Sequence, residues 1–181
     1  MKIIPESNLL DEAKIILSPN CDDRPDSSSI SLIIIHSISL PPSVFGGSYV
    51  EEFFLNKLKK SENDYINNLR NTKVSSHLYI KRTGEIIQFV NFNKRAWHAG
   101  KSTFENTSNC NDYSIGIELE GFDDIVYEDI QYEKLSKIIK ALLDFYPRIS
   151  KDRIVGHSDV SPQRKSDPGP LFDWKRLKSM L

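Results

Sequence analysis

Leu32-Ile33-Ile34-Ile35-His36 is a continuous apolar run that ends on an imidazole. A run of mostly β-branched residues without polar alternation is typical of a strand buried on both faces. Such strands belong to sheets that are covered on both sides, usually by helices. The run therefore predicts an α/β fold, and we expect residues 1–181 to form a single domain with a mixed central β-sheet flanked by helices.

Strand and helix patterns alternate along the rest of the chain. Further strands are predicted at 77–80 and 86–90, which form a hairpin, and at 113–119 and 154–155. Helices are predicted at 7–17, from Ser48 to about 60, at about 135–146, and at 172–180. The helix at Ser48 opens with the capping-box spacing to Glu51. Residues 22–29 and 91–112 are predicted as loops, and the second is long enough to be suspected of a functional role.

Charge and cysteine content exclude several classes of partner. The chain has 24 basic and 25 acidic residues and no dense Lys/Arg run, which argues against nucleic-acid binding. No stretch approaches the roughly 20 apolar residues of a membrane span, so no membrane association is expected. The N-terminal apolar segment is broken at Glu6, and Cys21 and Cys110 are far apart. We therefore expect two free thiols and a cytoplasmic protein. The sequence gives no evidence of an obligate protein partner.

Two histidines lie where the chemistry of an α/β sheet is usually found. His36 and His157 each follow an apolar strand, and residues at such strand ends converge on the ligand-binding crevice. One such histidine alone is more often structural, but two imidazoles with one carboxylate form a common catalytic zinc set. Asp159 and Asp167 are both candidates for the carboxylate, and spacing does not decide between them.

Glu118 lies within the predicted strand 113–119, on the side that also carries Ser114 and Gly116. Such a carboxylate more often lies on a solvent-exposed face of a strand and has no catalytic role. Beside a metal site it is a candidate general base. Tyr65, Trp97 and His98 are candidates for lining a sugar or peptide cleft, although an isolated aromatic residue more often belongs to the core.

Several strings together resemble the cytoplasmic AmpD-type anhydro-N-acetylmuramyl-L-alanine amidases, which are related to peptidoglycan recognition proteins. Their order and spacing extend over almost the whole chain, which makes the match specific. The strings are Cys21-Asp22-Asp23-Arg24-Pro25, His36 to Pro42 with Phe45-Gly46-Gly47, Lys94 to Gly100, Cys110 to Gly121, Gly156-His157-Ser158-Asp159, Arg164 to Pro170, and Phe172-Asp173-Trp174.

The resemblance implies the zinc amidase fold and a complete hydrolytic centre. Carried over by position, His36, His157 and Asp167 are the ligands of Zn²⁺, which settles the choice of carboxylate. Glu118 matches the catalytic glutamate and Lys165 the catalytic lysine, although from the residues alone Lys165 reads as a solvated loop lysine. The implied reaction is hydrolysis of the amide bond between (anhydro-)N-acetylmuramic acid and L-alanine in small muropeptides during peptidoglycan recycling.

The match also names candidate substrate contacts. Tyr65, Trp97 and His98 fall in segments that contact substrate or shape the cleft in the family. Where members often carry arginine, this chain has Lys73 and Asn109, and both positions are candidate contacts for peptide carboxylates. Two alternatives remain: a peptidoglycan-binding or sensing module without turnover, and a phage-type amidase that acts on the polymeric wall.

Overall fold

The two longest strands, β5 (Leu32–Ile38) and β11 (Ser114–Glu120), lie side by side in parallel at the centre of the sheet. The computed structural model describes residues 1–181 apart from the side chain of Ser28. Within that part, six strands form the main sheet in the order β12-β5-β11-β6-β7-β3. The other four are β12 (Ile154–Gly156), β6 (Leu78–Ile80), β7 (Ile86–Gln88) and β3 (Lys14–Ile15). The sheet is mixed because β7 runs antiparallel to β6, as predicted.

Side chains of β5 and β11 alternate between two buried layers. Ile33, Ile35, Ile115 and Ile117 pack into the layer beneath the helix α3 (Asp129–Phe145). The opposite face of the same strands carries Leu32 and Ile34, together with His36 and Glu118 by strand alternation. Residues Leu32 to His36 of β5 are all buried, so the two-sided burial predicted for this run is confirmed. The polar side chains of interest therefore lie on the sheet face opposite α3.

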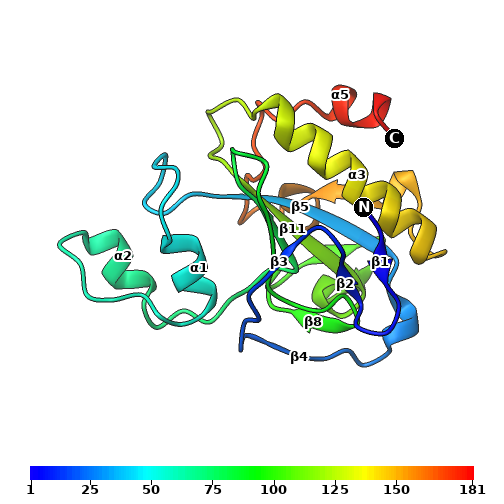
Figure 1. Ribbon diagram of the computed structural model, residues 1–181, viewed down its shortest axis with the longest axis horizontal. Helices are drawn as coiled ribbons and strands as arrows, with labels where there is room; N and C mark the ends of the chain where they lie inside the picture. The colour runs from blue at the N-terminus through cyan, green and yellow to red at the C-terminus, as the bar shows by residue number, and fades with distance from the viewer.

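Helix α3 covers one face of the sheet, and its sequence explains both its position and its ends (Figure 1). Leu135, Ile138, Ile139 and Leu142 recur at helical spacing and are fully buried. Glu128 and Gln131 form a capping box at the start, and Pro147 follows the last turn. The short helix α5 (Trp174–Ser179) lies beside α3, to which Arg176 is tied through Asp129.

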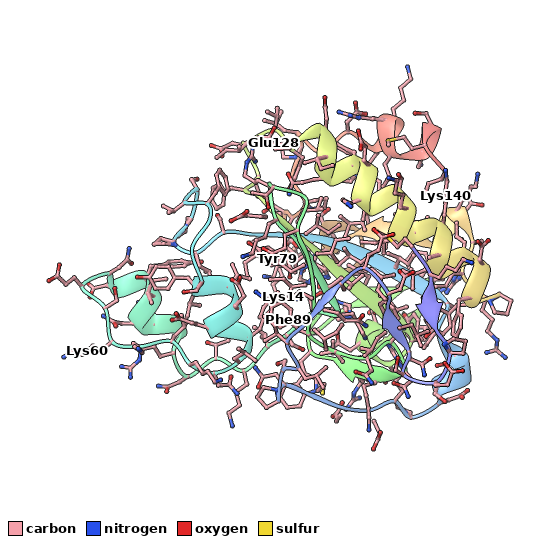
Figure 2. The ribbon with its side chains drawn as sticks, in the orientation of Figure 1. Lys14, Lys60, Tyr79, Phe89, Glu128 and Lys140 are labelled. Atoms are coloured by element: carbon pink, nitrogen blue, oxygen red, sulfur yellow. The ribbon has the colours of Figure 1, made fainter. Side chains whose placement is uncertain are left out.

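Two short helices, α1 (Tyr49–Phe54) and α2 (Asp64–Leu69), lie to one side of the sheet (Figure 1). Phe53 and Phe54 of α1 belong to a second apolar cluster with Tyr79, Ile87 and Phe89. Tyr79 and Phe89 lie inside the fold, whereas Lys60 and Lys140 project from its surface (Figure 2). This second cluster anchors α1 and α2 to the sheet face that carries His36 and Glu118.

Several sequence-based predictions of secondary structure were wrong. Residues 7–17 contain β2 (Leu9–Leu10), which pairs with β1 (Ile3–Ile4), and then β3, instead of a helix. Asn8 adopts φ of 54°, which a helix excludes, and the backbone of Leu10 bonds to the Gln88 side chain. The helix from Ser48 ends at Phe54 rather than near 60, because Asn56 also takes a positive φ of 58°. Ser48 binds Glu52 instead of forming the predicted capping box with Glu51.

Segments predicted as loops contain short regular elements. The strand β4 (Cys21–Asp23) pairs with β8 (Lys94–Ala96), and β9 (Thr103–Phe104) pairs with β10 (Thr107–Ser108). Helical turns occur at η1 (Ser27–Ser29), η2 (Cys110–Asp112), η3 (Lys151–Arg153) and α4 (His157–Val160). These elements are too short for hydrophobic periodicity to reveal them. Within the described part of the chain, no helix is both long and apolar enough to cross a membrane.

Candidate metal centre and catalytic cleft

Three side chains from separate segments meet at the carboxyl ends of the parallel strands. His36 lies near the end of β5, His157 opens α4 directly after β12, and Asp167 lies in the following loop. The Nδ1 atoms of the two histidines are 2.9 Å apart. Oδ2 of Asp167 lies 3.2 Å from Nδ1 of His36 and 3.1 Å from Nδ1 of His157. The three atoms form a nearly equilateral triangle.

This triangle fits a tetrahedral metal ion. Ligands at 2.0–2.2 Å from a zinc ion in tetrahedral geometry are separated by roughly 3.3–3.6 Å, close to the distances seen here. Two imidazole nitrogens and one carboxylate oxygen leave a fourth position open, which is the pattern of catalytic rather than structural sites. Of the described histidines, cysteines and acidic residues, these three form the cluster able to hold a metal ion.

The ionisation states of the three groups favour cation binding. Burial raises the pKa of Asp167, but the imidazoles of His157 and His36 beside its carboxylate outweigh it and hold that pKa well below its usual value. Burial also lowers the pKa of His36 to about 4, so its ring is neutral at physiological pH. A neutral imidazole and an ionised carboxylate are the forms that coordinate a metal.

The far sides of both imidazoles have defined partners. Nε2 of His157 lies 3.1 Å from the carbonyl oxygen of Ala99, which accepts a hydrogen bond in the tautomer that carries the proton on this nitrogen. Its Nδ1 therefore has a free lone pair directed at the triangle. Nε2 of His36 lies 2.9 Å from Nδ1 of His98. Both rings are thus held from behind, as is usual for histidines that bind a metal.

Asp159, the alternative carboxylate, is used elsewhere. Its Oδ2 accepts a hydrogen bond of 2.7 Å from the backbone N–H of Gly156 at the start of α4. This bond ties Asp159 to its own helix, whereas the loop that follows α4 brings Asp167 to the two histidines. Short-range spacing could not separate these two roles, because the position of Asp167 depends on where the chain turns after α4.

Glu118 lies on the strand next to His36, and the two residues are directly paired across β11 and β5. Its side chain is only 8% exposed, and among the described residues its Oε2 has no hydrogen-bond partner. Burial, and then the negative charge of Asp167, raise its pKa well above the usual value, while the charge of Lys165 acts in the opposite direction. A buried, unpartnered carboxylate that faces a cleft is a strong candidate for proton transfer.

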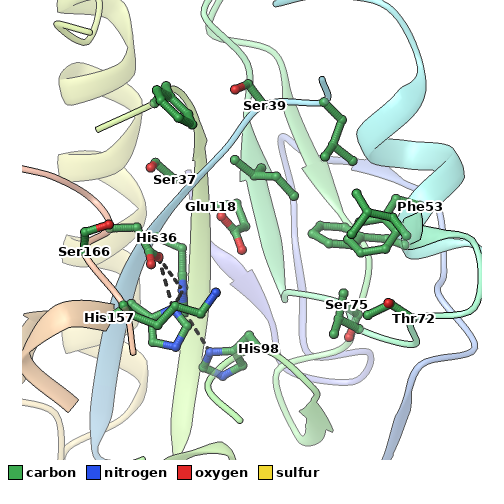
Figure 3. Close-up of a pocket in the computed structure, with 18 of the residues that line it drawn as sticks. His36, Ser37, Ser39, Phe53, Thr72, Ser75, His98, Glu118, His157 and Ser166 are labelled. Atoms are coloured by element: carbon green, nitrogen blue, oxygen red, sulfur yellow. Dashed lines mark hydrogen bonds and ion pairs between the residues drawn. The ribbon is translucent and has the colours of Figure 1, made fainter. Parts of the chain in front are cut away.

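The histidine cluster and Glu118 line one cleft of about 500 Å³, which is within the usual range for a small-molecule site. Figure 3 shows Glu118 between the imidazole cluster and the wall formed by Phe53. Lys165 is exposed and lines the cleft on the side of Asp167. Tyr65, which is 46% exposed, and Trp97 also line it.

Not every candidate substrate contact lies in the cleft. Lys73 and Asn109 are exposed and are not among the residues that line it. His98 does line the cleft, but it is half-buried and its Nδ1 faces His36 rather than the cleft. Of the candidate substrate contacts, Tyr65 and Trp97 therefore lie where a ligand could reach them, whereas Lys73 and Asn109 lie outside the cleft.

Sequence reasoning missed the residues that build the cleft wall. The apolar members that carried no sequence signal include Phe53, Phe54, Leu69 and Val74. Behind this wall, the buried amide of Asn20 donates to the carbonyl oxygens of Phe54 and Val74 at 3.2 and 2.8 Å. The local sequence around Asn20 gives no sign that its side chain supports the cleft wall, because its partners are 34 and 54 residues away.

Comparison with known proteins agrees with this geometry. Residues 26–170 match the family described as N-acetylmuramoyl-L-alanine amidase. The chain is 49% identical over 176 residues to the 1,6-anhydro-N-acetylmuramyl-L-alanine amidase AmpD of Haemophilus influenzae, with 97% of this chain and 96% of that protein covered. A crystal structure of a selenomethionine AmpD derivative superposes with a TM-score of 0.93 at 43% identity, covering 97% of each chain.

A second solved structure is that of a complex with a substrate. It is a complex of the amidase AmiD from Escherichia coli with the substrate anhydro-N-acetylmuramic acid-L-Ala-D-gamma-Glu-L-Lys. It superposes with a TM-score of 0.63 at 29% identity and covers 84% of this chain and 57% of that chain.

The family match to residues 26–170 includes His36, Glu118, His157 and Asp167.

Proposed function

This chain belongs to the N-acetylmuramoyl-L-alanine amidase family, and from that premise we propose how its cleft performs the reaction. The protein is a 1,6-anhydro-N-acetylmuramyl-L-alanine amidase of peptidoglycan recycling. We propose that the substrate is a soluble anhydro-muropeptide of the kind named in the AmiD complex. The bond cut is the amide between the lactyl carbonyl of the muramic acid and the nitrogen of L-alanine.

The proposed metal is zinc, held by His36, His157 and Asp167. Support comes from the donor set, from the 2.9–3.2 Å separations of the donor atoms, and from the partners that fix both rings. When bound there, zinc supplies Lewis acidity, which makes water a better nucleophile and polarises a carbonyl at neutral pH. The chain's own residues then have to move one proton and stabilise one negative charge.

Glu118 is the proposed proton carrier. Its ionised carboxylate takes a proton from the attacking water and delivers it to the nitrogen of L-alanine as the C–N bond breaks. Burial without a hydrogen-bond partner suits this role, because the raised pKa makes the carboxylate a stronger base. Lys165 is proposed to place its ammonium group near the oxyanion that forms at the lactyl carbonyl, where the loss of such a donor costs about 100- to 1000-fold in rate.

The single observation that carries this proposal is the pairing of the metal cluster with an unpartnered buried glutamate on the adjacent strand. The test is turnover of anhydro-muropeptide by wild type and by Glu118→Gln, with zinc content measured in the same samples. Glu118→Gln should keep its zinc and lose at least about 100-fold in kcat. A zinc-loaded Glu118→Gln enzyme with wild-type turnover would refute the proposed base.

The form of the substrate needs a separate assay, because a phage-type amidase would prefer polymeric wall. We expect release of stem peptide from soluble anhydro-muropeptide to exceed release from intact sacculi. A preference for sacculi would overturn the proposed recycling substrate without affecting the proposed zinc site. Bound substrate without any turnover by the zinc-loaded protein would instead indicate a sensing module.

Two further aspects belong to the same proposal. We propose a cytoplasmic location, which two free cysteines, Cys21 and the buried Cys110, support; cell fractionation tests it. We also propose that residues 1–181 fold as a single amidase domain, because one sheet is built from strands between Lys14 and Gly156. Limited proteolysis that released a separately folded fragment would contradict this.

A further inference from the structure

We infer that His98 is a positioning residue for the metal site, which it serves by holding the ring of His36 in the orientation and tautomer that zinc binding requires. The inference rests on the proposed zinc site and goes beyond it, because His98 contributes no ligand atom. The sequence placed this residue among the candidate substrate contacts. The structure assigns it a different partner.

The hydrogen bonds at His98 define a direction for the protons. If Nδ1 of His36 is to bind a metal, its Nε2 must carry the proton and donate it. The partner of that nitrogen is Nδ1 of His98 at 2.9 Å, which therefore has to accept. A neutral His98 that accepts at Nδ1 carries its own proton on Nε2, and the hydroxyl of the fully buried Ser114 lies 3.3 Å from this atom.

The ring of His98 is fixed by packing as well as by hydrogen bonds. It lies flat enough against β11 that a Cβ added to Gly116 would stand 2.5 Å from its Cγ and 2.6 Å from its Nδ1. Only a glycine leaves room for the ring at this position. The rings of His98 and His36 meet edge to face with centroids 5.1 Å apart. The imidazole is therefore clamped between the strand and the ligand that it supports.

The backbone of the same segment is anchored independently. Oδ1 of Asn111 accepts from the N–H of His98 at 3.2 Å and from the N–H of Ala99 at 2.8 Å. The carbonyl of Ala99 accepts in turn from Nε2 of His157 at 3.1 Å and from Arg164 at 2.6 Å. Two consecutive residues thus support both histidine ligands, His98 through its side chain and Ala99 through its carbonyl.

Two amide substitutions of His98 separate this role from packing. Asparagine places its Oδ1 near the position of Nδ1 and keeps an acceptor for His36. Glutamine places its amide near the position of Nε2, next to Ser114, and leaves Nε2 of His36 without a partner. His98→Phe keeps an aromatic ring against Gly116 and offers no acceptor. The asparagine and glutamine pair therefore tests the position of the acceptor, and phenylalanine tests the ring without an acceptor.

The experiment measures the zinc dissociation constant of each folded variant by competition with a chelator, and the visible spectrum of the cobalt-substituted protein. We expect His98→Gln and His98→Phe to bind zinc about 10- to 100-fold more weakly than wild type, with altered cobalt bands. We expect His98→Asn to stay within about threefold of wild type, since it preserves the supporting bond. KM for anhydro-muropeptide should stay near the wild-type value in every zinc-loaded variant.

Each other outcome has a definite meaning. Equal zinc affinity in wild type, His98→Gln and His98→Phe overturns the inference, as does an equal loss in all three variants, which would indicate packing alone. A raised KM with unchanged zinc affinity would make His98 a substrate contact and also overturn it. Should His98→Phe fail to fold, the asparagine and glutamine pair decides. Failure of the wild type itself to bind zinc would refute the proposed function instead.

Discussion

Gly116→Ala is expected to weaken zinc binding although position 116 touches no metal ligand. The added methyl would stand 2.5 Å from Cγ, 2.6 Å from Nδ1 and 2.9 Å from Cδ2 of the His98 ring. Carbon atoms in ordinary contact are about 3.5–4.0 Å apart, so the ring has to retreat by roughly 1 Å. His98 cannot retreat freely, because Asn111 holds its backbone N–H.

The displacement translates into two measurable losses. A hydrogen bond of 2.9 Å between His98 and His36 that lengthens by this amount leaves the range of useful hydrogen bonds. Loss of such a supporting bond weakens metal affinity by about tenfold or more, which is about 1.4 kcal/mol. Overpacking of the interior costs a further 1–3 kcal/mol or so, which lowers Tm by roughly 2–12 °C in a protein of this length.

The assay combines chelator competition with thermal unfolding of the zinc-free protein. The matched control is Gly84→Ala in the β6–β7 turn, where an added Cβ would lie 2.5 Å from Cγ1 of Ile130 and φ is +84°. Both variants should unfold at lower temperature, and only Gly116→Ala should lose zinc affinity. Wild-type Tm and zinc affinity in Gly116→Ala would refute the described packing of His98. Equal zinc loss in Gly84→Ala would show that general destabilisation is the cause.

Three further outcomes are expected. Removal of zinc should abolish turnover. If free zinc is present at about 1000 times its dissociation constant, its removal by a chelator should lower the unfolding free energy by about 4 kcal/mol, as calorimetry will measure. Glu118→Gln should raise the thermal stability of the zinc-free protein at neutral pH. Burial raises the pKa of Glu118 in the folded state, so its stabilising contribution is complete below the unfolded-state pKa and lost as pH rises through the folded-state pKa. A difference in Tm between variant and wild type that does not grow with pH would contradict this. Asn20→Ala should cost about 1–3 kcal/mol of stability, because the partly buried carbonyl of Val74 loses its donor while that of Phe54 keeps only Ser18. Since both residues line the cleft, KM should rise more than kcat falls, as steady-state kinetics will show.

The central sheet could be predicted from the sequence because an uninterrupted apolar run has a single structural cause, burial of a strand on both faces. The run Leu32–Ile35 is apolar at every position, since both faces of β5 are covered, and no helix or exposed strand requires such a run. The predicted helix at 7–17 failed for the opposite reason. Its apolar residues serve short strands paired with partners far along the chain, such as β7, and local periodicity contains no information about those partners.

The site was predictable where function coincides with a strand end. His36 and His157 were identified as candidate ligands by their position after apolar strands, and the structure brings them together. The choice between Asp159 and Asp167 depended on the path of the loop after α4. The support that His98 gives to His36 depended on a contact across 62 residues of sequence. Contacts of this kind follow from the assembled fold rather than from any local pattern.

The pairing of Glu118 with His36 across β11 and β5 divides the molecule into parts that can diverge at different rates. The spacing between the proposed base and the first proposed zinc ligand is set by backbone hydrogen bonds in the middle of the sheet, which tolerate neither insertion nor slippage. The wall opposite, with α1 and α2, is joined to the sheet by loops and by the buried amide of Asn20. A change in the length or sequence of α1 and α2 can therefore reshape what the cleft accommodates while the sheet keeps the spacing of Glu118 and His36.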